Sequence, residues 1–257
     1  LLLALASGSV DDPATRLAVG LAIAATVALV VVGGIRRIAR VASLLVPFMV
    51  AVYFAMVAWV LATHFSAIPG AFASIFTEAF SLDAGLGALA GVAITGARRA
   101  ALVNEAGVGT ASIMHGASRG SSPVNEGLIA MLGPAIDSGL VCTLTALAIM
   151  LGCDITQAEG IRGLSVAMTA FGSTIPGGRW LLLFVVACFA LSSMFSYSFY
   201  GNRCAAYLFG ESRARYYTWF FIATLVIFAV IPLSAAVSLC DLFFALMVFP
   251  TMATLLR

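Results

Sequence analysis

The chain has 257 residues, of which 62% are hydrophobic and only 9% are charged, and its formal net charge is +2. An ordinary soluble domain has about 45–50% apolar and about 25% charged residues, so water cannot be the solvent for most of this surface. The net charge is too small to indicate binding to nucleic acid. We therefore expect an all-α integral membrane protein that lies in a lipid bilayer.

Two apolar runs near the start, residues 17–34 and 44–64, are each about long enough to cross a bilayer, which needs about 20 apolar residues. Between them lie Arg36, Arg37 and Arg40, and a basic cluster of this kind predicts a cytoplasmic loop. Residues 66–82 have phenylalanines at four-residue spacing and are too short to span. They predict a helix that lies along the outer interface.

The rest of the chain predicts five more spans and one long loop. Residues 84–118 are apolar but rich in glycine, with Asn104 and Glu105 among them, which predicts a broken helix. Four further spans follow at 127–152, 180–206, 216–236 and 239–256. The loop 153–178 has a middle part that is able to form a small helix. We interpret residues 1–257 as a single transmembrane domain with about seven helices.

The arginines predict the orientation of these helices. Alternate loops collect eight of the thirteen: Arg36, Arg37, Arg40, Arg119, Arg203, Arg213, Arg215 and Arg257. Since positive residues favour the cytoplasmic side, we expect the chain to start outside and to end in the cytoplasm. The chain begins with Leu1 rather than Met and shows no targeting segment, so we interpret it as truncated at its N-terminus.

The run from Asn104 to Ser112 is the most informative segment for function. It places polar residues and the glycines Gly107 and Gly109 in the middle of an apolar stretch, and such backbone is tolerated in a membrane only inside protein or beside a water-filled cavity. Discontinuous helices of this kind bind substrate and ions in secondary transporters. The alternative interpretation is a glycine-mediated helix contact in which the polar side chains bond to a neighbouring helix.

Four stretches of the sequence resemble one known family, in order and over most of the chain. They are GGIRRIARVASLLVPFM, ITGARRAALVNEAGVGTASIMHGAS, PVNEGLIAMLGPAIDSGLVCTLTALAIMLG and FALSSMFSYSFYGNRCAAYLFG. The family they resemble is the alanine or glycine:cation symporter family. Val108 and Thr110 stand where that family usually has Met and Ser.

The resemblance implies a leucine-transporter-like fold of two inverted five-helix repeats. The helices present here would be the fourth to the tenth of that fold, and the loop 153–178 would be its outer lid. The missing N-terminal helices of the same protein would be a partner of this chain. The implied function is sodium-coupled symport of small neutral amino acids, alanine or glycine, by alternating access. The implied location is the plasma membrane, here a bacterial inner membrane. Sodium is the expected coupling ion, a proton is the alternative, and no other cofactor is expected.

The segment and the resemblance together select the candidate site residues. The predicted substrate ligands are Asn104, Ala106, Gly107, Gly109 and Thr110, and the predicted sodium ligands are Ser192 and Ser193, with Asp137 as a further candidate. Hydroxyl and carbonyl oxygens suit a hard cation. Glu105 is expected to stabilise the unwound segment. Two alternatives remain open, because the serines would otherwise bond to the preceding helical turn and Asp137 would otherwise pair with Arg98 or Arg99.

An intramembrane enzyme and a channel are the rival hypotheses. An enzyme would need a nucleophile with a base, paired acids or metal ligands at one depth in the membrane, whereas His64 and His115 both fall at span ends and no HExxH motif occurs. A channel would show repeated pore loops or rings of one residue type, which the sequence lacks. We therefore expect a transporter without catalytic residues.

Overall fold

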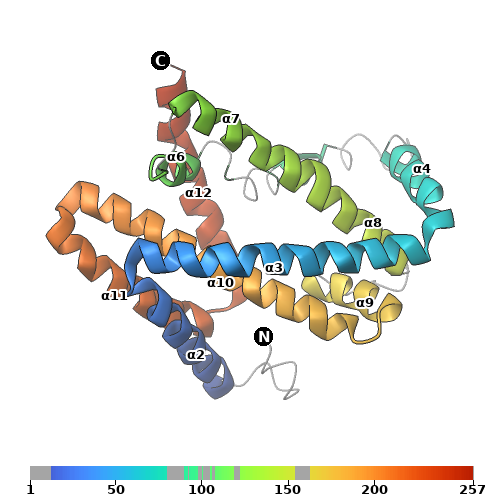
Figure 1. Cartoon of the computed structure of the whole chain (residues 1–257), viewed down its shortest axis with the longest axis horizontal. Coiled ribbons are helices and arrows are strands. Elements are labelled where there is room, and N and C mark those ends of the chain that lie inside the picture. Colours follow the sequence, from blue (N-terminus) through green and yellow to red (C-terminus); the bar gives the residue numbers. More distant parts are fainter. Residues whose placement is uncertain are drawn as a thin grey trace. The chain divides into compact units, whose positions relative to one another are not determined.

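The computed structural model describes residues 13–79, 90–91, 93–97, 100, 105, 108–118, 122–153 and 163–256. Every regular element within these residues is a helix (Figure 1). Five helical stretches are long and apolar enough to cross a membrane: Ala14–Val31, Gly34–Thr63, Pro123–Gly152, Gly178–Phe209 and Ser234–Thr254. These lengths and compositions are those of a multi-pass integral membrane protein.

Two of the seven expected spans are not among these five stretches. The segment expected to span at 216–236 lies in α11 (Glu211–Val230), whose first turns contain Glu211, Arg213 and Arg215 and are therefore less apolar. The segment 84–118 contains only one helix with described bounds, α6 (Thr110–His115), which is far too short to cross a bilayer.

The basic cluster after the first span lies at the start of a helix rather than in an irregular loop. Helix α2 (Pro13–Val31) is followed by a turn at Val32 and Gly33, and α3 (Gly34–Thr63) begins at once. Gly34 has a φ of 72°, a left-handed conformation that glycine adopts without strain. The arginines 36, 37 and 40 therefore project from the first turns of α3, where long side chains can reach water.

The chain forms two compact units, which we describe separately. The first consists of Leu1–Met49 and Val186–Met247, and the second consists of Val50–Val185 and Val248–Arg257. In the first unit α2 packs along α11 (Figure 1). A Cβ added to Gly20 would lie 2.5 Å from the Cβ of Ala229, so the small residue at position 20 permits this close approach.

The last three helices have different bounds from those expected. Helix α10 covers Gly178–Phe209, and Gly210, with a φ of 86°, separates it from α11. Helix α11 ends six residues before the expected position because Ile231 precedes Pro232 and adopts an extended conformation. Helix α12 (Leu233–Leu255) consequently begins six residues earlier than predicted.

The second unit contains most of the shorter elements. The turn η1 (Phe65–Ala67) leads into α4 (Ile68–Ala79), which lies where the interfacial helix was expected. The expected span at 127–152 begins earlier, at Pro123, because proline favours the first helical position. It is a continuous helical stretch composed of α7 (Pro123–Pro134), the π-helical η3 (Ala135–Cys142) and α8 (Thr143–Gly152).

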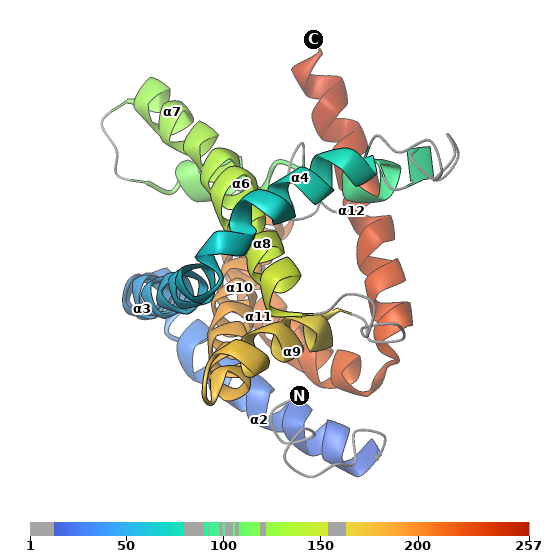
Figure 2. The same cartoon turned by 90° about the vertical axis from the view of Figure 1, so that its right-hand side faces the viewer.

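The expected lid region contains a helix that packs against α8. Helix α9 (Leu164–Thr174) lies beside α8 in Figure 2, and a Cβ on Gly152 would lie 2.6 Å from the carbonyl oxygen of Ala170. The hydroxyl of Ser173 donates to the carbonyl of Gly152 over 2.6 Å. Phe171 is fully buried, and its ring centroid lies 6.4 Å from that of Tyr53 on α3. Part of the loop 153–178 is therefore packed helix.

Large apolar side chains remain exposed along the long helices. Leu29 on α2, Leu44 on α3 and Phe189 on α10 are 68%, 78% and 60% exposed. In water such surfaces would favour aggregation, whereas lipid accepts them. Their exposure is therefore consistent with helices whose outer faces contact lipid.

Candidate functional site

The backbone before α6 departs twice from helical geometry. Glu105 has a φ of 50° and Gly109 a φ of 89°, and the N–H of Val108 donates to the carbonyl of Glu105 over 3.2 Å. A positive φ is uncommon for a residue other than glycine, and such conformations often occur at ligand sites. Helix α6 then begins at Thr110. The chain therefore makes a tight turn within the segment that the sequence singles out.

Thr110 and Glu105 are brought together by this turn. The Thr110 side chain is 3% exposed, and its hydroxyl donates a hydrogen bond to the Glu105 carboxylate. A bond to a charged acceptor is stronger than one between neutral groups, and burial makes it costly to lose. The hydroxyl of Thr110, a predicted substrate ligand, thus contacts the residue that was expected to stabilise the segment.

Thr251 on α12 is a neighbour that sequence reasoning missed. Its hydroxyl donates to the carbonyl of Val108 over 3.4 Å, and a Cβ added to Gly109 would lie 3.5 Å from its Oγ1. The available signal was Pro250, a proline inside α12 directly before Thr251. The left-handed backbone favours glycine at position 109, whereas the distance to Thr251 is an ordinary van der Waals contact.

The other predicted substrate ligands lie outside the described residues. These are Asn104, Ala106 and Gly107, and Arg98 and Arg99, the possible partners of Asp137, also lie outside them. The structure therefore places Gly109 and Thr110 of the predicted substrate ligands, together with Glu105.

Asp137 lies in the π-helical turn η3, near the middle of the stretch Pro123–Gly152. It is half-buried and follows Pro134, whose missing N–H and bulky ring disturb regular helical bonding. Short π-helical insertions are frequent at functional sites. Among the described residues, no group of three or more His, Cys, Asp or Glu side chains forms a metal-binding cluster.

Ser192 and Ser193 lie on α10 in the first unit. Ser192 is 9% exposed and donates to the carbonyl of Phe189 over 2.8 Å, which is the back-bonding alternative considered above. Its own carbonyl accepts a hydrogen bond from Ser196 over 3.2 Å. Ser193 is half-buried. The hydroxyls of Ser192 and Ser196 thus donate their hydrogen bonds to carbonyls of α10 itself.

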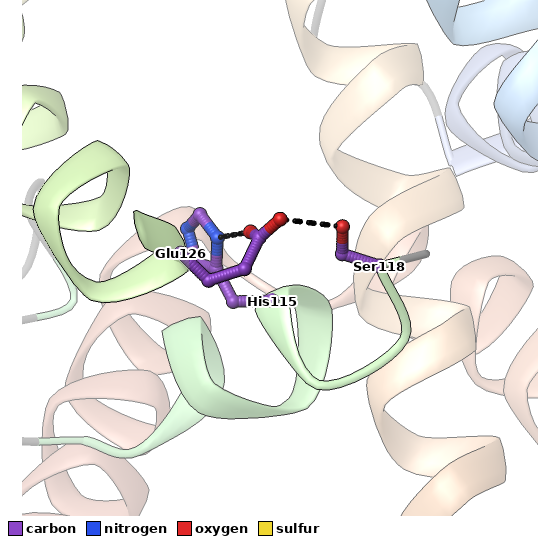
Figure 3. A network of polar contacts seen from close by, with 3 residues as sticks. All are labelled: His115, Ser118 and Glu126. Carbon is purple, nitrogen blue, oxygen red and sulfur yellow. Dashed lines mark hydrogen bonds and ion pairs between the residues drawn. The ribbon is translucent and has the colours of Figure 1, made fainter. Parts of the chain in front are cut away.

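A network that was not predicted joins α6 to α7 (Figure 3). One carboxylate oxygen of Glu126 lies 3.0 Å from Nδ1 of His115, and the other accepts a hydrogen bond from the hydroxyl of Ser118 over 2.7 Å. All three residues line a pocket of about 580 Å³. Glu126 lies in the first turn of α7, and its carboxylate links that helix to the end of α6.

Ser118 also lies at the centre of a G-x-S-x-G pattern, Gly116 to Gly120. In hydrolases this pattern places the serine on a turn between a strand and a helix, beside a histidine base. Here the segment follows α6, and the hydroxyl of Ser118 bonds to Glu126, with His115 bonded to the opposite oxygen. Both side chains bond to the same carboxylate, an arrangement that differs from the serine–histidine pair of those hydrolases.

The long apolar helices define a multi-pass membrane protein. The chain belongs to the sodium:alanine symporter family, whose model matches residues 5–257. This finding confirms the resemblance identified in the sequence.

Named relatives agree with this assignment. The sodium/alanine symporter AgcS of Methanococcus maripaludis is 34% identical over 223 residues, which cover 85% of this chain and 48% of the relative. The "Probable sodium/glutamine symporter GlnT" of Bacillus subtilis is 28% identical over 238 residues, 91% of this chain and 49% of the relative. The sodium/proton-dependent alanine carrier protein of Bacillus sp. strain PS3 is 28% identical over 229 residues, which cover 83% of this chain and 51% of the relative. The chain spans about half the length of these relatives.

Proposed function

We propose that this protein is part of a secondary active transporter that carries small neutral amino acids, alanine or glycine, together with sodium by alternating access. Membership of the sodium:alanine symporter family supports the class. The observation that carries the proposal is the left-handed backbone at Glu105 and at Gly109, because both residues lie in an apolar segment shortly before the short helix α6.

The proposed substrate site is the segment from Asn104 to Thr110. Backbone at Ala106, Gly107 and Gly109, with the side chain of Asn104, would bind the amino and carboxylate groups. Thr110 contributes by holding the Glu105 carboxylate in place, which is supported by their hydrogen bond. The proposed site consists of glycine backbone rather than a roomy pocket of side chains, so the preferred substrate has few side-chain carbons.

The proposed sodium ligands are the hydroxyls of Ser192 and Ser193, and Asp137 is proposed separately as a residue that helps to bind a cation. Ser192 is nearly buried, and its hydroxyl is able to rotate from the carbonyl of Phe189 towards a cation. A hard cation prefers such oxygen ligands. The same oxygen ligands would also accept a hydronium ion, so they do not distinguish sodium from a proton. One relative is named for both sodium and protons.

In the fold that we propose, the helices are the fourth to the tenth of a leucine-transporter-like bundle, and the remaining helices are partners in the same assembly. The protein lies in the plasma membrane, a bacterial inner membrane, with its first described residues outside and its last residues in the cytoplasm. The basic residues in the first turns of α3 and of α11 support this orientation.

Uptake into proteoliposomes tests the proposal. The protein is reconstituted together with any residues that its gene encodes on either side of 1–257, and the uptake of radiolabelled alanine is measured under an inward sodium gradient. We expect accumulation above the outside concentration, and no accumulation when potassium replaces sodium. Equilibration without accumulation would instead support a channel, and consumption of alanine would support an enzyme.

A further inference from the structure

Another pocket, also of about 580 Å³, lies in the unit that contains α2 and α11. It is formed by the end of α2, the first turns of α3, the last turns of α10 and the first turns of α11. Its lining combines apolar side chains, among them Ile35 and Trp219, with the charged side chains of Arg203, Glu211 and Arg215. The pocket is separate from every residue proposed above for substrate or sodium.

Arg203 is oriented in this pocket but keeps hydrogen-bonding capacity. Its guanidinium carbon lies 5.2 Å from the centroid of the Phe199 ring, and its Nη1 lies 3.6 Å from a carboxylate oxygen of Glu211. The Arg203 and Glu211 side chains are 49% and 80% exposed, and an ion pair this open to solvent contributes little. Since a guanidinium has five N–H donors, Arg203 has donors left for an anion.

Arg215 adds a second guanidinium to the same lining. It is exposed and takes part in no ion pair within the described parts of the chain. The charged side chains of the pocket therefore sum to a net positive charge. Two guanidinium groups match the oxygens of a phosphate, which arginine binds through paired N–H donors.

The position of the pocket along the helices indicates the source of that phosphate. It lies where α2 ends and α3 begins, both of which contain stretches apolar enough to span a membrane, and α3 has further arginines in its first turns. Val32, Ile35 and Trp219 are 57%, 36% and 58% exposed beside the charged groups. Basic pockets between membrane helices bind anionic lipid headgroups, and an exposed apolar border accepts an acyl chain.

We propose that this pocket binds an anionic phospholipid, with Arg203 and Arg215 contacting the headgroup phosphate and the acyl chain lying along Ile35 and Trp219. The bound lipid bridges the α2–α3 turn and the α10–α11 turn, since all four helices line the pocket. Glu211 competes with the phosphate for Arg203, because its carboxylate already faces that guanidinium.

Native mass spectrometry of the delipidated protein tests this site, with phosphatidylglycerol as the anionic probe and phosphatidylcholine as the zwitterionic comparison. The Arg203→Gln/Arg215→Gln variant should lose about tenfold in affinity for phosphatidylglycerol, as expected for the loss of charge-assisted phosphate contacts. The control is Arg36→Gln/Arg37→Gln, which removes the same charge from α3 outside the pocket lining and should change the affinity much less. Equal losses in the two variants would mean general surface attraction and would overturn the proposal.

Glu211→Gln provides a test that does not depend on a loss of function. It removes the competing carboxylate, so phosphatidylglycerol should bind more tightly than to the unaltered protein. Unchanged or weaker binding would contradict the assigned role of Arg203. Inorganic phosphate is added as a competitor in a final arm. Displacement of the lipid by millimolar phosphate would identify a soluble anion as the occupant and would overturn the assignment to a lipid.

Discussion

The hydroxyl of Thr110 donates a hydrogen bond to the carboxylate of Glu105, and so closes the turn that precedes α6. Glu105 is in a left-handed conformation, which is unfavourable for its side chain, and the bond to Thr110 offsets part of that cost. The carboxylate therefore has a local partner of its own. The proposed substrate would be bound by the backbone that this pair holds in place.

Removal of this hydrogen bond should destabilise the segment. Thr110→Val keeps the shape of the side chain and should lower the free energy of unfolding by about 2 kcal/mol, because a buried bond to a charged group is lost. Thr110→Ser, which retains the hydroxyl, should behave nearly as the unaltered protein in chemical denaturation. In a double-mutant cycle with Glu105→Gln the two effects should not add. Additive effects would mean that the pair does not interact.

Gly109 should not tolerate a side chain. Gly109→Ala places a Cβ on a left-handed residue, at a cost of about 1–2 kcal/mol, and brings it against Thr251. We expect loss of alanine uptake while the protein still reaches the membrane, measured by transport and by immunoblotting of membranes. Gly133→Ala is the matched control, since a Cβ there would meet no atom within 4 Å. Normal uptake by the Gly109 variant would remove this turn from the site.

Ser192 and Ser193 should set the dependence on sodium. Ser192→Ala/Ser193→Ala should raise the sodium concentration for half-maximal uptake by about tenfold, equivalent to about 1.4 kcal/mol of lost cation binding. Ser198→Ala is the control, because Ser198 makes the same kind of bond to the preceding turn, to Phe195 over 2.7 Å. If both variants shift the sodium dependence alike, or if only expression falls, the serines have a structural role alone.

The contact between His115 and Glu126 should stabilise the junction of α6 and α7. Glu126→Gln replaces the shared carboxylate and should lower the Tm of the protein in detergent, because both His115 and Ser118 lose a charged partner. His115→Gln should have a smaller effect, since Ser118 keeps its bond to Glu126. High salt should reduce the difference between the His115 variant and the unaltered protein, as it screens a partly exposed pair. Equal Tm values for all three proteins would contradict this role.

The sequence predicted the long helices better than the contacts between them. Apolar runs of about 20 residues indicate spanning helices by themselves, and α2, α3 and α10 follow them. The ends were less predictable, because Gly210 and the residue before Pro232 leave helical geometry at positions that the apolar pattern does not mark. The contact of Thr251 with Val108 joins residues far apart in the chain, which periodicity cannot indicate. The π-helical turn at Asp137 likewise depends on tertiary context rather than on local propensity.

The central claim is that amino acid and sodium move together, and reciprocal coupling tests it most directly. Proteoliposomes containing the protein, with any flanking residues that its gene encodes, are loaded with and bathed in equal concentrations of radiolabelled sodium, and alanine is then added outside only. Since coupling is reciprocal, the inward alanine gradient should drive sodium into the vesicles above its outside concentration. Sodium that stays at its starting ratio while alanine enters would contradict symport and the account built on it.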